Sequence, residues 1–385
     1  MSKTVLRGAK VYTKEFIFEE KSVIIEDEKI TCVLDKSEKT PTSDADIVDL
    51  TGKYIIPGLV DIHLHGAVGA DFCDGNEEAF HKIAKYEASQ GIAAICPTTM
   101  TLPYDTLENV MKCAQGAVQS QSRDEATIMG INVEGPFVSK EKCGAQNPEY
   151  LKNPDIEAFN RLQSVSGDLI RLVDIAPELE GAEDFIRQVA PRCRVSLAHT
   201  TADYETASRA FKLGAKHVTH LHNAMPPLLS REPGLIGAAF DNSEVTPELI
   251  CDGYHILPAM VRATFKLFGA DRMILISDSC MAAGMPAGEY SLGGQPVFMK
   301  DRKATLADGT LAGSASNLMD CLQQCIQYMN IPVCDAVRAA TYNPAKAMGV
   351  LDEFGTIESG KKADLVILNG DYEMESVVLN GVKLV

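Results

Sequence analysis

The sequence predicts a (β/α)8 barrel, with β-rich segments at both ends of the chain. Strand and helix patterns alternate from Pro57 to about Ala347, and candidate ligand residues stand at the ends of several strands. Eight apolar runs have the length of buried strands. They are Leu59–His65, Ala93–Thr98, Ile128–Glu134, Ile170–Ala176, Val195–His199, Val218–His222, Glu248–Cys251 and Met273–Ser277.

Helix patterns separate these runs. They cover Glu77–Gln90, Asp105–Gln119 and Tyr204–Leu213, and the first and third of them stop before a glycine. Eight such units over roughly 290 residues have the scale of a TIM-like barrel. An open, doubly wound sheet is the alternative. The barrel is favoured because ligands at the C-terminal ends of many different strands are typical of barrel sites.

The two ends of the chain have a different texture. Short alternating strands such as Val23–Glu26 and Asp364–Leu368 are bounded by turn residues. We therefore expect residues 1–53 and 348–385 to form a small β-rich domain, and residues 54–347 to form the barrel.

Composition limits the function classes. The chain has 385 residues, 11 cysteines and a formal net charge of −17. It has no run of eighteen apolar residues that would predict a membrane span, and its acidity argues against nucleic-acid binding. The N-terminal sequence has no apolar signal core and the cysteines form no CxxC pair, so we expect a cytoplasmic protein with reduced thiols.

Two histidines close the first barrel strand in PGLVDIHLHG, residues 57–66. Residues i and i+2 of a strand share a face, so His63 and His65 can point into one pocket. An isolated pair of histidines can be an ordinary part of a core or surface. At the end of a buried strand, two adjacent imidazoles need a shared partner, and a divalent metal ion supplies one.

A carboxylate ends the third strand in GINVEGPF, residues 130–137. Burial alone would keep Glu134 protonated, so its carboxylate needs a positive partner. An ion pair with an arginine is one alternative. A metal-ligand role is favoured once the histidines are counted.

Further histidines follow in SLAHTT and VTHLHNAM. His199 ends one strand, and His220 is expected to be a ligand from the next. His217 has the opposite parity and is expected to pack between barrel and helices. His222 shares the parity of His220, and a substrate-shaping role and no role are equally consistent with its position. His81, in a helix pattern, is expected at the surface.

The last strand, in MILISDS, ends at Asp278. A helix N-cap is one explanation of this residue. The alternative is a general acid/base, which takes a proton from the attacking water and later gives it to the leaving amine. Six candidate residues at strand ends together indicate a metal-dependent hydrolase. They are His63, His65, Glu134, His199, His220 and Asp278.

With these residues the sequence resembles the amidohydrolase superfamily, and the N-acetylglucosamine-6-phosphate deacetylase family within it. The segments EGPF, GAQNPEY, THLHNAMPPLLSREPG, DGYH and TLAGS carry the resemblance, which covers nearly the whole chain. It implies a small β-sandwich built from both termini, a homodimer, and hydrolysis of the acetamido group of an amino-sugar phosphate. It also implies one or two divalent ions per chain, with zinc, iron and manganese all compatible.

The resemblance assigns roles to the candidate ligands. Glu134, His199 and His220 match the primary metal ligands, and His63 and His65 match the pair that holds a second ion in some members. Asp278 matches the catalytic acid/base.

The resemblance also implies the substrate contacts. Arg231 and His255 match a cationic clamp for the phosphate, with the arginine supplied by a neighbouring subunit. The other positions that match substrate contacts are Ala145, Gln146, Asn223, Ala224, Leu311, Ala312 and Gly313.

Two positions depart from the family pattern. Gln146 stands where a histidine often polarises the amide carbonyl, and it can donate one hydrogen bond in that role. His222 stands where an aromatic residue is more usual. Two other functions stay open: deacetylation of a related substrate, such as N-acetylgalactosamine 6-phosphate or an N-acyl amino acid, and a non-catalytic scaffold. None of the six candidate residues is missing, which disfavours the scaffold.

Overall fold

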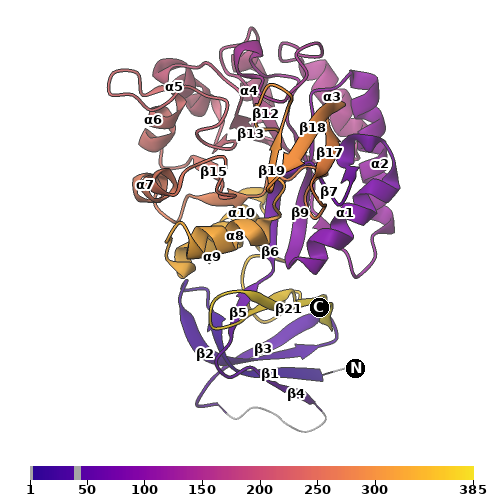
Figure 1. Ribbon diagram of the computed structural model, residues 1–385, viewed down its shortest axis with the longest axis vertical. Coiled ribbons are helices and arrows are strands. Elements are labelled where there is room, and N and C mark those ends of the chain that lie inside the picture. The colour runs from indigo at the N-terminus through magenta and orange to yellow at the C-terminus, as the bar shows by residue number, and fades with distance from the viewer. Residues whose placement is uncertain (1–2, 39–44) are drawn as a thin grey trace.

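The two ends of the chain form one eight-stranded sheet, below the barrel in Figure 1. The computed structural model describes residues 3–38 and 45–385. The strand order is β22-β21-β20-β5-β1-β2-β3, with β4 paired to β1. The strands are β1 (Lys3–Tyr12), β2 (Phe18–Glu26), β3 (Lys29–Asp35), β4 (Asp46–Asp49), β5 (Tyr54–Pro57), β20 (Leu365–Leu368), β21 (Met374–Leu379) and β22 (Val382–Lys383).

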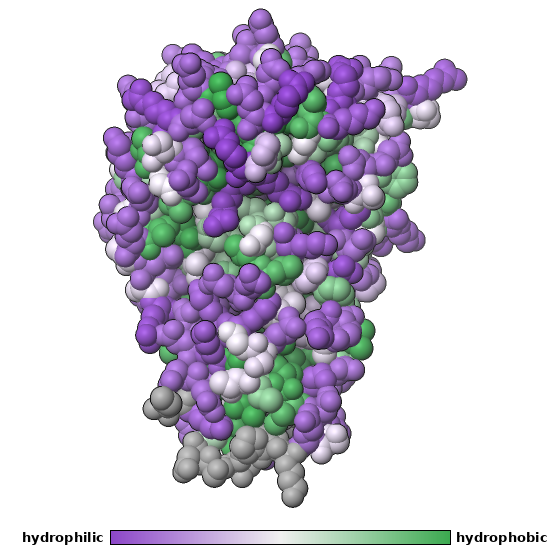
Figure 2. Space-filling model, turned by 180° about the vertical axis from the view of Figure 1, so that it is seen from behind, coloured by the Kyte–Doolittle hydropathy of each residue, from purple (hydrophilic) through white to green (hydrophobic). Residues whose placement is uncertain are grey.

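This sheet has a hydrophobic core of its own. Val11, Val23, Ile25, Ile55 and Leu365 are buried there together, so residues from both ends of the chain pack against one another. The result is the predicted small sandwich. Figure 2 shows the opposite side of the molecule, where hydrophilic side chains cover most of the surface. The exact division at residues 53 and 347 stays a prediction.

The central part of the chain forms a parallel barrel. Neighbouring strands run in the order β9-β11-β12-β13-β14-β15-β16, with β6 beside β9 and the short β10 also paired to β9. They are β6 (Leu59–Leu64), β9 (Ile92–Thr99), β10 (Thr127–Ile128), β11 (Ile131–Val133), β12 (Ile170–Ile175), β13 (Arg194–Leu197), β14 (His217–Val218), β15 (Thr246–Ile250) and β16 (Ile274–Ile276).

Backbone hydrogen bonds join the last strand to the first. The N–H of Asp278 donates to the carbonyl of His63 at 2.9 Å, and the N–H of His65 donates to the carbonyl of Ser279 at 2.8 Å. These bonds bring the C-terminal ends of β6 and β16 together. The predicted barrel and its eight strands are confirmed.

Helices surround the barrel (Figure 1). They are α1 (Glu77–Ser89), α2 (Tyr104–Ser120), α3 (Ile156–Val165), α4 (Ala182–Val189), α5 (Tyr204–Leu213), α6 (Gly234–Asp241), α7 (Pro258–Phe268), α8 (Leu318–Gln327), α9 (Val333–Ala340) and α10 (Tyr342–Met348). In α1, the side chain of Asn76 accepts a hydrogen bond from the N–H of Ala79 and caps the helix. The three predicted helices agree with α1, α2 and α5 to within a residue or two.

Several predicted strands were too long at their C-terminal ends. The strand predicted at Val218–His222 stops at Val218, because His220 and His222 have φ of 30° and 80°, outside the strand region. His199 and Asp278, with φ of 45° and 48°, likewise lie beyond β13 and β16. The shared strand face expected for His220 and His222 is therefore wrong.

Two small sheets complete the fold. A three-stranded sheet that the sequence analysis did not predict follows β16: β17 (Gly288–Leu292), β18 (Gln295–Lys300) and β19 (Lys303–Thr305). A two-stranded pair, β7 (Gly66–Ala67) and β8 (Ala70–Asp71), follows β6.

All 11 cysteines lie within residues 3–38 and 45–385 and are free thiols. None of the helices in these ranges has the length and apolarity needed to cross a bilayer.

Candidate metal centre and active site

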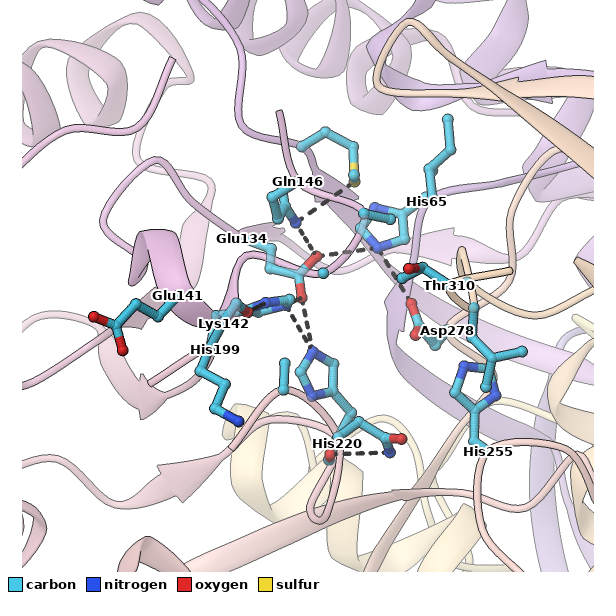
Figure 3. Close-up of a pocket in the computed structure, with 18 residues that line it drawn as sticks. His65, Glu134, Glu141, Lys142, Gln146, His199, His220, His255, Asp278 and Thr310 are labelled. Carbon is cyan, nitrogen blue, oxygen red and sulfur yellow. Dashed lines mark hydrogen bonds and ion pairs between the residues drawn. The ribbon is translucent and has the colours of Figure 1, made fainter. Parts of the chain in front are cut away.

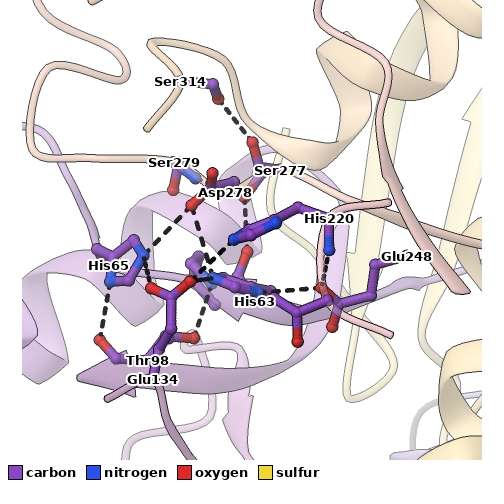
Figure 4. Close-up of polar contacts among 12 residues, drawn as sticks. His63, His65, Thr98, Glu134, His220, Glu248, Ser277, Asp278, Ser279 and Ser314 are labelled. Atoms are coloured by element: carbon purple, nitrogen blue, oxygen red, sulfur yellow. Dashed lines mark hydrogen bonds and ion pairs between the residues drawn. The ribbon is translucent and has the colours of Figure 1, made fainter. Parts of the chain in front are cut away.

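Glu134, the residue after β11, lies at the centre of the site. Its carboxylate is almost completely buried among imidazoles (Figure 3 and Figure 4). Its Oε1 lies 3.1 Å from Nε2 of His199 and 3.1 Å from Nε2 of His220. The Nε2 of His65 lies 3.2 Å from Oε2, and the Nε2 of His63 lies 3.6 Å from Oε1. The five predicted ligands therefore converge.

These side chains form two overlapping groups of three. One consists of Glu134, His199 and His220, and the other of His63, His65 and Glu134. Within each group the candidate ligand atoms all lie within 4.8 Å of one another. Imidazole and carboxylate are ligands of zinc and of other first-row transition metals. The arrangement can hold a divalent ion, and Glu134 has an oxygen for each group.

Hydrogen bonds at Nδ1 orient three of the imidazoles. Nδ1 of His199 contacts the carbonyl of Lys142 at 2.7 Å, and Nδ1 of His65 contacts the carbonyl of Thr98 at 3.2 Å. Nδ1 of His63 lies 3.0 Å from Oε2 of Glu248 (Figure 4). In each case Nδ1–H donates, so the neutral imidazole has its lone pair on Nε2, the atom that faces Glu134.

One of the Nε2 atoms that face Glu134 has no hydrogen-bond partner in the part of the chain that the structure describes. Nε2 of His63 is buried and accepts no hydrogen bond from the described residues. Such buried polar atoms are rare in folded proteins, and an ion is one of the standard explanations. The residues of the centre therefore fit a divalent metal ion.

The charges of the centre also favour a cation. Burial alone would lower the pKa of His63, but Glu248 and Glu134 raise it well above the usual range. Burial likewise opposes protonation of His65, yet Asp278 and Glu134 raise its pKa to about 9. Burial raises the pKa of Glu134, but the imidazoles, first of all His63, hold it well below its usual value. Metal ions compete with protons for such groups.

Asp278 borders the same centre. Its Oδ1 lies 3.2 Å from Nε2 of His65 and 3.6 Å from Nε2 of His63. Burial raises the pKa of Asp278, but hydrogen bonding to His65 and the nearby imidazole charges lower it overall. The N-cap explanation is wrong, because the next helix of the described chain is α8 and Asn317 caps it. Asp278 is an ionised carboxylate beside the cluster, as a general base requires.

A cavity of about 340 Å³ opens over the centre (Figure 3). Most of the predicted substrate contacts line it. These are Ala145, Gln146, Asn223, Ala224, His255, Leu311 and Gly313. Ala312 is fully buried behind its neighbours and does not line the cavity.

Arg231 is the predicted contact that lies elsewhere. Its side chain is exposed and borders a separate cavity of about 460 Å³, together with Thr201, Tyr204 and Glu232. Within a single chain it does not line the cavity over the metal centre.

Gln146 does not have the free donor that the sequence analysis expected. Its Nε2 donates to Oε2 of Glu134 at 2.8 Å and lies 3.7 Å from Sδ of Met100. Its Oε1 accepts from the N–H of Thr101 at 2.7 Å. The amide group therefore holds Glu134 in place, and its strong donor points at the carboxylate.

His255 and His222 occupy different environments. Nδ1 of His255 contacts Oδ2 of Asp252 at 2.8 Å, and this carboxylate raises the pKa of His255 although burial opposes it. His255 is thus suited to carry positive charge in the cavity. His222 turns away, with Nε2 2.8 Å from the hydroxyl of Thr264 on α7. His222 therefore does not line the cavity.

The remaining histidines lie away from the cavity. His217, expected between barrel and helices, is fully buried with Nε2 3.0 Å from Oε1 of Glu248. His81 lies on α1, partly exposed, and contacts Glu125.

Sequence reasoning missed part of the lining. Met100, Lys142, Leu292 and Thr310 also border the cavity. Lys142 is just upstream of GAQNP, and its charge beside that segment was the available signal. Leu292 arrives with the unpredicted β17, and Thr310 is the first residue of the TLAGS segment, of which only Leu311, Ala312 and Gly313 were predicted as contacts.

Comparison with known proteins adds the family. Residues 54–384 match the amidohydrolase family. The chain belongs to the amidohydrolase family. It is 34% identical to N-acetylglucosamine-6-phosphate deacetylase of Bacillus subtilis over 380 residues, which cover 98% of this chain and 96% of that protein. It is 30% identical to N-acetylgalactosamine-6-phosphate deacetylase of Escherichia coli O157:H7, with 98% of each chain covered.

Solved structures of this amidohydrolase group have the same fold. A mutant N-acetyl-D-glucosamine-6-phosphate deacetylase from Mycobacterium smegmatis, in complex with N-acetyl-D-glucosamine-6-phosphate, superposes with a TM-score of 0.92. The two chains are 30% identical, and the match covers 100% of this chain and 99% of the other. Similarity over the complete length includes the barrel and the terminal sandwich.

Proposed function

We propose that this amidohydrolase hydrolyses the acetamido group of N-acetyl-D-glucosamine 6-phosphate, giving D-glucosamine 6-phosphate and acetate. The observation that carries the proposal is the convergence of four imidazoles on Glu134, with Asp278 beside two of them, beneath a cavity. The names of the full-length relatives and the substrate held by the Mycobacterium smegmatis structure support the choice of substrate.

The chemistry of an amide explains the need for this centre. An amide is a poor electrophile with a poor leaving group, so hydrolysis needs an activated water, stabilisation of the developing oxyanion and a proton for the amine. A divalent ion, when bound, polarises the carbonyl and lowers the pKa of water. His199, His220 and Glu134 would hold it, and His63 and His65 would hold a second ion that shares Glu134.

Asp278 performs the proton transfers. Its carboxylate is ionised and lies at the edge of the cluster, where it accepts the proton of the attacking water. The same proton then passes to the nitrogen of the departing amine, which leaves as glucosamine 6-phosphate. Asn223, Ala224 and Leu311 line the cavity and would orient the sugar, which places the amide over the centre.

The phosphate of the substrate needs local positive charge in an acidic chain. His255 lines the cavity, and Arg231 would enter it from the second subunit of a homodimer. The exposed apolar side chains of Leu228 and Leu229, beside Arg231, support an interface there. Remote phosphate contacts provide binding energy that orients the amide.

Location, domains and metal are part of the same proposal. The free thiols support a cytoplasmic protein. Residues 1–53 and 348–385 would form the sandwich, with 54–347 forming the barrel. Zinc, iron and manganese all suit imidazole and carboxylate ligands.

A galactosamine substrate is the second candidate. The full-length similarity to an N-acetylgalactosamine-6-phosphate deacetylase favours it specifically. The test is acetate release from a panel of N-acetylglucosamine 6-phosphate, N-acetylgalactosamine 6-phosphate and N-acetylglucosamine. We expect the highest kcat/KM on the first. A higher value on the second would reassign the substrate, and no release from any of them by metal-loaded protein would support a non-catalytic scaffold.

A further inference from the structure

Glu248 is a buried carboxylate that the proposed reaction does not use. It is the third residue of β15, and its side chain has no exposed surface. Its carboxylate meets three nitrogens. Oε2 lies 3.0 Å from Nδ1 of His63 and 3.0 Å from the backbone N of His220 (Figure 4). Oε1 lies 3.0 Å from Nε2 of His217.

The direction of these bonds determines the tautomer of His63. An ionised carboxylate only accepts hydrogen bonds, so the histidine nitrogens that face Glu248 carry protons. A neutral His63 therefore has its proton on Nδ1 and its lone pair on Nε2. That Nε2 is the buried atom without a hydrogen-bond partner in the described structure, and it faces Glu134 and Asp278.

Glu248 also touches the other group of ligands. It accepts from the backbone N–H of His220, a residue with the left-handed φ of 30°. Non-glycine residues adopt this conformation only where neighbouring contacts maintain it. One carboxylate thus contacts a histidine of each metal group, His63 by its ring and His220 by its backbone.

We propose that Glu248 is a positioning residue for the metal centre, which fixes His63 as an Nε2 ligand and joins it to the backbone at His220. Carboxylates that hold the second nitrogen of a ligating histidine orient the ring and increase its basicity. His65 and His199 have backbone carbonyls in this place, so His63 alone of the three has a charged acceptor. The inference rests on the proposed metal-dependent function.

The variant Glu248→Gln removes the charge and little else. The amide oxygen can accept from His63 and His220, and its NH2 group can face His217, which can donate from Nδ1 to the hydroxyl of Thr246 at 2.8 Å. The matched control is Asp174→Asn on β12. Asp174 is equally buried, and its Oδ1 accepts a hydrogen bond from the hydroxyl of Thr219 at 2.8 Å.

The experiment measures zinc binding to the apoproteins by chelator competition and metal analysis. We expect the wild-type chain to bind two zinc ions. In Glu248→Gln the affinity for the second ion should fall by about 10- to 100-fold. Asp174→Asn should bind both ions like the wild type. Unchanged second-ion affinity in Glu248→Gln, an equal loss in the control, or a single ion per wild-type chain would each overturn the inference.

Two further measurements cover other outcomes. If Glu248→Gln does not fold, Glu248→Asp takes its place. This variant keeps the charge but withdraws the carboxylate from His63, and we expect a similar loss of affinity for the second zinc ion. In zinc-loaded wild-type protein, long-range ¹H–¹⁵N NMR should find the His63 proton on Nδ1, and a proton on Nε2 would contradict the inference. Acetate release tests the proposed function separately, because zinc affinity and tautomer can be as stated in a protein that releases no acetate.

Discussion

Asp278 lies where a proton can pass between a water molecule at the centre and an amine in the cavity. We predict that Asp278→Asn retains the fold and metal but lowers kcat by about a hundredfold or more, since the amide cannot act as a base. Steady-state acetate release, metal content and the melting temperature check this. A rate within about tenfold of the wild type would remove Asp278 from the acid/base role.

The candidate ligands were predictable because each belongs to a short motif at a strand end. His63 and His65 share an HxH segment, and Glu134 precedes Gly-Pro. Glu248 had no such signal, because it begins a predicted strand as an isolated acid. Its partners His63 and His217 belong to other strands, so only the folded chain shows these contacts. The role of Gln146 was equally hidden, since its contact with Glu134 depends on how a loop folds back.

At the level of strands and loops, the ligands depend on sharp turns after short strands. The backbone leaves the strand region at His199, His220 and Asp278, and their side chains lie around Glu134 and His65 (Figure 3). Apolar runs predicted the strands but not where they end, because a turn with positive φ depends on contacts made by other elements.

Gly135 makes the turn after β11 that carries Glu134. Its φ is +85°, and a Cβ there would lie 2.1 Å from Oγ1 of Thr101, whose N–H supports Gln146. We predict that Gly135→Ala displaces Glu134 and lowers both metal content and the melting temperature. The left-handed backbone alone costs about 1–2 kcal/mol.

Gly52→Ala is the control for this change. Gly52 has a φ of +84° and no atom within 4 Å of the added Cβ, so it adds the backbone strain without the collision. Metal analysis and thermal unfolding separate the two effects. Equal metal content in Gly135→Ala and the wild type would show that the turn at Gly135 does not control the position of Glu134.

The small sheet after β16 shows where strand prediction failed. In β18 the buried Val297 and Met299 flank the exposed Phe298, so three apolar residues in a row conceal the alternation. Most of β17 is exposed or half-buried and begins with Gly288. Such polar strands have weak signals, and this sheet contributes Leu292 to the cavity.

For the whole molecule, the proposed dimer makes Arg231 a residue of the partner's site. We predict that Arg231→Ala lowers kcat/KM for the phosphorylated substrate by about tenfold to a hundredfold, because charge-assisted hydrogen bonds contribute about 1.5–3 kcal/mol. The effect on N-acetylglucosamine should be much smaller. Equal losses on both substrates would show that Arg231 serves the fold or the interface.

Mixed dimers test the exchange of Arg231 directly. A dimer of Arg231→Ala and Asp278→Asn subunits contains one site with both groups intact if the arginine crosses the interface. Random exchange of the two impaired proteins should then restore about a quarter of the wild-type kcat/KM in a two-fold dimer. No recovery after confirmed exchange would confine Arg231 to its own subunit.

The most direct test of the metal-dependent deacetylase is a metal titration of the apoprotein with N-acetylglucosamine 6-phosphate as substrate. Acetate release should be negligible without metal and should reach its maximum at two equivalents per chain, because His63 and His65 complete a second group with Glu134. A maximum at one equivalent would reduce the centre to a single ion. Full activity of metal-free protein, or no acetate at any metal loading, would contradict the central claim.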